Sequence, residues 1–99
     1  MLTKSDALEI VIKKLGERSS PDAPLVVVEK DTIEKSFGWV FFYDSKKYLE
    51  TGARRYALAG NGPVIVNKHK GSIDFFGSAK APLEIVAEYE KQLAEHTNS

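Results

Sequence analysis

The segment from Trp39 to Tyr43 constrains the fold most, because all five of its residues are apolar or aromatic. Side chains alternate along a strand, so Trp39, Phe41 and Tyr43 would face one side of a sheet and Val40 and Phe42 the other. A strand with two apolar faces needs cover on both sides of its sheet. The sequence therefore predicts a sheet that is buried on both faces.

Three further segments have the composition of strands. Residues 25–28 are apolar and lead towards Ile33, residues 64–66 are apolar on both sides, and residues 72–76 follow a turn at residues 68–71. The first of these and residues 39–43 form a predicted hairpin. The simplest assembly is a four-stranded antiparallel meander.

Two helices flank the predicted sheet. Thr3 and Asp6 have the spacing of a helix start, and an apolar stripe follows and ends before Gly16. Pro82 stands at the first position of the second helix, whose polar tail from residue 95 to 99 is expected to fray. The predicted stripes consist of Ala7, Leu8, Val11, Ile12 and Leu15 in the first helix, and of Leu83, Val86, Tyr89, Leu93 and Ala94 in the second. The predicted fold class is α+β, with the four-stranded sheet between an N-terminal and a C-terminal helix.

The connection at residues 45–62 is unusually long for a compact domain. It carries Tyr48, Leu49, Tyr56, Ala57 and Leu58, so we expect it to be ordered. We predict that it covers the second apolar face of the sheet, while both helices cover the first.

The composition fits a single domain spanning residues 1–99. Fourteen basic residues balance fourteen acidic ones, which argues against nucleic acid as a partner. The chain has no cysteine, no signal-peptide pattern and no apolar run near the roughly 18 residues that span a membrane. We expect a soluble, cytoplasmic protein that does not bind membranes.

Residues for catalysis or cofactor binding are sparse. His69 lies between two lysines in a turn and His96 lies in the polar tail, and neither has a second ligand at a metal-binding spacing. Residues 59–63 contain two glycines but lack the lysine of a phosphate loop, so we interpret them as a turn. We predict no catalytic residue, no metal and no cofactor.

Charge is uneven along the chain. Residues 40–71 contain six basic and two acidic residues, whereas residues 72–99 contain two basic and five acidic ones. Ordinary solvated surface explains this pattern, but arginine and tyrosine together are also typical of protein interfaces. The candidate partner-binding residues are Lys46, Lys47, Tyr48, Arg54, Arg55 and Tyr56.

Two further features have alternative interpretations. Trp39 is expected in the core, with a solvent-facing anchor as the alternative. The outer side of the second helix carries Glu84, Glu88, Lys91 and Glu95, which fit either a solvated face or a docking site for a basic partner.

The order and spacing of several segments resemble the immunity protein 35 family, also called the YrhB domain. These segments are residues 38–43, 48–52, 58–66, 70–73 and 77–84, followed by the helix that contains Tyr89. Asn67 is one departure, because the family pattern has an aspartate there in many relatives. The basic character of residues 45–55 is another. The family pattern marks mostly glycines, a proline and core aromatics, which are residues of the fold, so no catalytic or toxin-binding position can be transferred.

The resemblance implies a bacterial polymorphic-toxin system, in which such domains are encoded beside toxins, including ones with a papain-like fold. It implies an immunity protein without enzymatic activity that binds and neutralises its cognate toxin by stoichiometric occlusion. The alternative from another class is a chaperone-like or stress accessory protein that binds unfolded clients. A contiguous exposed apolar patch would favour that alternative, and a charged, aromatic patch would favour a specific toxin.

Overall fold

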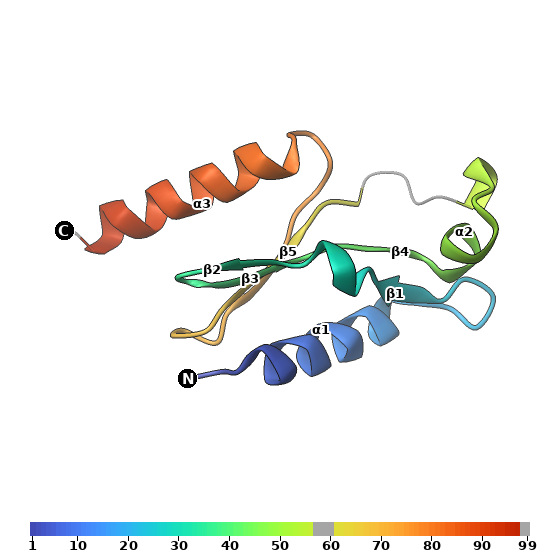
Figure 1. Ribbon diagram of the computed structural model, residues 1–99, viewed down its shortest axis with the longest axis horizontal. Helices are drawn as coiled ribbons and strands as arrows, with labels where there is room; N and C mark the ends of the chain where they lie inside the picture. The colour runs from blue at the N-terminus through green and yellow to red at the C-terminus, as the bar shows by residue number, and fades with distance from the viewer. Residues whose placement is uncertain (57–60, 98–99) are drawn as a thin grey trace.

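A computed structural model of the chain describes residues 1–56 and 61–97. Its elements, in chain order (Figure 1), are α1 (Lys4–Arg18), β1 (Leu25–Val27), the 3-10 helix η1 (Glu29–Asp31), β2 (Ile33–Lys35), β3 (Gly38–Phe41), β4 (Tyr43–Ser45), α2 (Lys46–Thr51), the 3-10 helix η2 (Arg54–Tyr56), β5 (Val64–Asn67), β6 (Ile73–Phe75) and α3 (Pro82–Thr97). The predicted α+β class is confirmed.

The main sheet is the predicted antiparallel meander, in the order β2-β3-β5-β6. Val40 lies opposite both Ile33 of β2 and Ile65 of β5. The first predicted strand is divided, because η1 separates β1 from β2 and β1 pairs with β4 in a separate two-stranded ribbon. The three residues of η1 are charged and exposed, and such residues are poor strand formers. The hairpin of residues 25–45 is therefore one long arm with an interruption (Figure 1).

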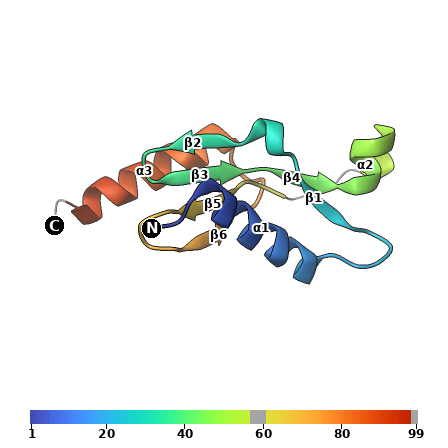
Figure 2. The ribbon, with the colours of Figure 1, turned by 60° about the horizontal axis from the view of Figure 1, so that its bottom comes forward.

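Each face of the sheet is covered by one helix. Ala7, Val11 and Leu15 of α1 pack with Trp39 and Phe41 on one face. Ile85 and Val86 of α3 pack with Phe37, Val40 and Ile65 on the other. Figures 1 and 2 show α1 and α3 on opposite sides of the strands.

The prediction that both helices share a face is therefore wrong, and α3, not the described part of residues 45–62, covers the second face. Val40 is nevertheless fully buried, as expected for a sheet with two apolar faces. The apolar stripe of a helix indicates that the helix packs on a sheet, but it does not indicate which face of the sheet the helix covers. The predicted loop residues Ala57 and Leu58 lie outside the described residues.

The predicted start of α1 is confirmed, and its predicted end is not. The Thr3 hydroxyl accepts from the Asp6 amide at 3.2 Å, and the Asp6 carboxylate accepts from the Thr3 amide at 3.0 Å. Gly16 does not end the helix, which continues to Arg18, because an interior glycine costs only about 1 kcal/mol. The Ser19 hydroxyl donates to the Leu15 carbonyl at 2.7 Å and closes the last turn.

The second predicted helix starts at Pro82 as expected, but it is longer than expected. It runs to Thr97 and so includes most of the tail that was expected to fray. The apolar stripes are also narrower than predicted, since Ile12 is 52% exposed and Leu83 is 73% exposed. Three or four apolar positions per helix are sufficient to cover strands this short.

Two glycines allow close approaches within the sheet. Gly38 has a φ of 147°, and a side chain there would collide with the carbonyl of Val66. A side chain at Gly62 would collide with the carbonyl of Gly77. The second approach holds the segment after β6 against residues 62–63, where the Phe76 amide donates to the Pro63 carbonyl at 3.0 Å.

Asn67 connects the β5–β6 turn to α3. Its side chain is only 2% exposed, and its Oδ1 accepts from the amides of His69 at 3.0 Å and Lys70 at 2.9 Å. Its Nδ2 donates to the Tyr89 hydroxyl of α3 at 3.2 Å. The Tyr89 ring in turn packs on Phe37, with 4.8 Å between ring centroids. Asn67 therefore fixes both the turn and the position of α3 on the sheet.

Candidate functional site

The predicted partner-binding residues lie in a lobe at one end of the molecule. We call residues 46–56, which form α2 and η2, the basic lobe. It lies beyond the end of the β1–β4 ribbon and away from both helical layers (Figures 1 and 2). It therefore extends the long axis of the molecule instead of covering the sheet.

The start of the lobe is anchored to the ribbon. The Lys46 amide donates to the Pro24 carbonyl at 2.9 Å, which ties the start of α2 to the chain before β1. Asn61 follows the lobe, and its Nδ2 donates to the Tyr43 carbonyl at 2.8 Å. The first of these bonds positions the start of α2 relative to the arm of the hairpin.

Local sequence explains why α2 forms. The buried Ser45 is its N-cap, and the Ser45 hydroxyl accepts from the Tyr48 amide at 3.0 Å. Gly52 ends the helix in the left-handed conformation, with a φ of 71°, and its amide donates to the Tyr48 carbonyl at 2.7 Å. The Thr51 hydroxyl also donates to the Lys47 carbonyl, at 2.6 Å.

The lobe is strongly cationic on its surface. Lys46, Lys47, Arg54 and Arg55 are all exposed, and within residues 46–56 Glu50 is the one acidic residue. The Lys46 ammonium lies 3.8 Å from the Glu50 carboxylate, and both side chains are more than half exposed. Such a surface pair contributes little to stability and leaves the charges accessible to a partner.

Tyr48 is partly exposed, so it remains a candidate contact residue. The neighbouring Leu49, which was not among the candidates, is 44% exposed. The exposed apolar side chain of α2 is therefore Leu49. Tyr56 is the last residue of η2.

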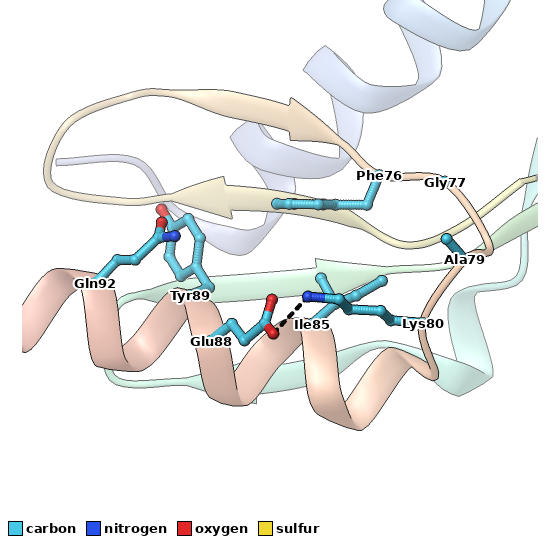
Figure 3. Close-up of a pocket in the computed structure, with 8 residues that line it drawn as sticks. All are labelled: Phe76, Gly77, Ala79, Lys80, Ile85, Glu88, Tyr89 and Gln92. Carbon is cyan, nitrogen blue, oxygen red and sulfur yellow. Dashed lines mark hydrogen bonds and ion pairs between the residues drawn. The ribbon is translucent and has the colours of Figure 1, made fainter.

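A second candidate site lies between α3 and the segment that follows β6. It is a cavity of about 260 Å³, with the apolar side chains of Phe76, Ile85 and Tyr89 in its wall (Figure 3). Lys80 and Glu88 meet at its rim, with 2.6 Å between Nζ and Oε1. Sequence reasoning identified the acidic side of this helix but not the cavity, which depends on how α3 sits on the sheet.

Hydrogen bonding raises the pKa of Lys80, because the Glu88 carboxylate accepts from its ammonium group, and the charges of Glu88 and Glu84 act in the same direction. Both side chains of the pair are about half exposed, so solvent screens the attraction. The pair can therefore open at little cost.

The structure also locates the other residues that were singled out from the sequence. Trp39 is 6% exposed and belongs to the core under α1, so the core interpretation is confirmed. His69 is exposed beside the turn that Asn67 organises. In the part of the chain that the structure describes, no group of three or more metal-ligating side chains gathers. Within those same residues, no helix has the length and apolar character needed to cross a bilayer.

Comparison with known proteins identifies the family. The family described as Immunity protein 35 matches residues 5–92, from α1 into α3. The "Uncharacterized protein YrhB" of Escherichia coli (strain K12) is 41% identical over 69 residues, which make up 70% of this chain and 73% of that protein. No solved structure matches the chain at a significant level. Since the family match covers nearly the whole chain, this protein belongs to the immunity protein 35 family.

Proposed function

We propose that this protein is an immunity protein that binds one cognate toxin and neutralises it by 1:1 occlusion. Membership in the immunity protein 35 family carries the proposal. We further propose that the toxin is encoded nearby, that a toxin domain with a papain-like fold is the first to test, and that the complex forms in the cytoplasm. In this proposal the protein acts by binding and catalyses no reaction.

The basic lobe is the surface that best supports a specific partner. Four exposed cations and the half-exposed Leu49 lie on a lobe whose start is tied to the ribbon. Arginine is enriched at interface hot spots. We therefore propose that the lobe contacts an acidic surface of the toxin.

The distribution of exposed apolar side chains supports a specific partner over unfolded clients. Within the described residues, the large apolar side chains that are well exposed are Met1, Ile12, Leu49 and Leu83. They belong to the N-terminus, α1, α2 and α3, and α1 and α3 lie on opposite faces of the sheet. Binding of many unfolded clients would instead favour one contiguous apolar patch.

Co-expression with the toxin from the adjacent open reading frame tests the proposal. Wild-type protein should restore growth, and the double variant Arg54→Glu, Arg55→Glu should bind the toxin at least about tenfold more weakly, because close interfacial charge pairs contribute about 1.5–7 kcal/mol. The control is Lys13→Glu, Lys14→Glu, which reverses two adjacent exposed lysines on α1. Equal affinity of a folded Arg54→Glu, Arg55→Glu variant and wild type would exclude the lobe from the interface. No protection by wild type would refute the toxin-binding function.

A further inference from the structure

The cavity beside α3 has the size of a receptor for one side chain. Its volume of about 260 Å³ lies just below the range of roughly 300–1,000 Å³ that is typical of small-molecule sites. The Gly62 approach holds residues 76–77 in place on one side of it, and the Asn67–Tyr89 bond positions α3 on the other. Two contacts far apart in the sequence thus place the two sides of the cavity.

The cavity has an apolar wall and a charged rim. Phe76, Ile85 and Tyr89 form an apolar wall, and Ala79 adds a small side chain beside it (Figure 3). Leu or Phe side chains are the natural complement of such a wall, because burying either one contributes about 1.5–3 kcal/mol.

The charged residues that line the cavity are Lys80 and Glu88, which pair with each other at the rim. Glu84 lies one helical turn before Glu88 on α3 and adds a second carboxylate that acts electrostatically on Lys80. Asp74 of β6 is a further carboxylate outside the cavity lining. Asp74 pairs with Ile65, whereas Ile73 and Phe75 face the core under α1, so strand alternation places Asp74 on the α3 side of the sheet. A cationic group that displaced Lys80 would therefore meet the carboxylate of Glu88 directly and that of Glu84 one helical turn away.

We propose that this cavity receives an anchor side chain of the toxin, a leucine or phenylalanine that is followed by a lysine or arginine. The apolar side chain fills the cavity, and the neighbouring cation takes the place of Lys80 beside Glu88. The occupant's identity as a toxin segment rests on the proposed function, whereas the preference for an apolar group with an adjacent cation rests on the cavity and its rim alone.

Fragment binding tests this preference without any toxin. The probes are 2-phenylethylamine, which is cationic at pH 7, and 3-phenylpropionate, which is anionic. In amide-detected NMR titrations, the amine should shift the signals of Gly77, Ala79 and Glu88, and it should bind about threefold or more tightly than the anion, as one exposed ion pair allows. Equal binding of both probes, or shifts elsewhere only, would overturn the proposal.

Two variants test the site itself. Ala79→Phe should fill the cavity and abolish the shifts, whereas Ala87→Phe, an exposed position of α3 that does not line the cavity, should bind like wild type. Glu88→Gln removes the carboxylate that pairs with Lys80, so the preference for the cation should disappear even if Ala79→Phe is poorly folded. Retention of cation preference in Glu88→Gln would contradict the assignment of the rim.

The toxin then identifies the occupant. Ala79→Phe should weaken the toxin complex at least about tenfold, while Ala87→Phe leaves it unchanged. A folded Ala79→Phe variant that loses fragment binding but keeps full toxin affinity would overturn the toxin segment as the occupant and leave the proposed function standing. A wild-type protein that binds the amine but no toxin would refute the proposed function and leave the cavity's preference standing.

Discussion

Replacing Asn67 should release both the β5–β6 turn and α3. Its side chain makes three hydrogen bonds, two accepted from the amides of His69 and Lys70 and one donated to the Tyr89 hydroxyl. A typical hydrogen bond contributes about 1 kcal/mol net, so Asn67→Ala should lower the free energy of unfolding by about 2–3 kcal/mol. For a domain of this size, that loss lowers Tm by about 10–20 °C.

Two companion variants separate the bonds. Asn67→Asp keeps an acceptor for the two amides, and the Tyr89 hydroxyl can donate to the carboxylate, so it should cost less than about 1 kcal/mol. This tolerance is consistent with the aspartate expected at this position in many relatives. Tyr89→Phe removes only the bond to α3 and should cost about 0.5–1.5 kcal/mol. Because the two residues share that bond, the losses of Asn67→Ala and Tyr89→Phe should not add in the double variant.

Urea unfolding at pH 7, followed by circular dichroism, measures these differences as shifts in midpoint at constant m-value. An Asn67→Ala variant within about 0.5 kcal/mol of wild type would refute the role of Asn67. Strict additivity of Asn67→Ala with Tyr89→Phe would refute the connection to α3 while leaving the turn intact.

Three further predictions concern the core, the first helix and bound groups. Trp39→Ala should destabilise the domain by about 3–5 kcal/mol in urea unfolding, because Trp39 is 6% exposed, and a loss below about 1 kcal/mol would place Trp39 outside the core. The Thr3 amide lowers the pKa of Asp6, so the carboxylate stabilises α1 above the ordinary pKa of 3.8 and loses that effect as the pH falls through its lower folded value. The stability advantage of wild type over Asp6→Asn should therefore be full at pH 7 and shrink as the pH falls below 3.8, and an advantage independent of pH would contradict this. Native mass spectrometry of freshly purified protein should give the mass of the chain alone, and a stoichiometric metal or nucleotide would contradict the prediction of no cofactor.

Elements with strong local signals could be predicted from the sequence. The capping pair of Thr3 and Asp6, the proline at the start of α3 and the two-sided strand around Val40 all act through neighbouring residues or strict alternation. The order of the strands in the meander could be predicted because the simplest connection joins consecutive strands in an antiparallel pair. Local signals failed at Gly16, where the packing of α1 on the sheet outweighs the small cost of a glycine.

Features that depend on three-dimensional packing could not be predicted in this way. An amphipathic helix has the same pattern whichever face it covers, so the separation of α1 and α3 was missed and the long connection was assigned to the wrong place. The exposed cations of the basic lobe could be identified because charge is readable from sequence, whereas the exposure of Leu49 depended on the orientation of α2. The cavity beside α3 depends on Gly62, Asn67 and Tyr89, which are far apart in the chain.

Isothermal titration calorimetry of the purified protein against the purified toxin domain from the adjacent reading frame, inactivated by substitution, tests the toxin-binding function most directly. We expect a stoichiometry of one to one and a Kd of about 1 nM or lower, which corresponds to a binding free energy of about −12 kcal/mol. The Arg54→Glu, Arg55→Glu variant should keep the stoichiometry and lose at least about tenfold in affinity. The absence of measurable binding by the wild-type protein would contradict the proposal that it is an immunity protein for that toxin.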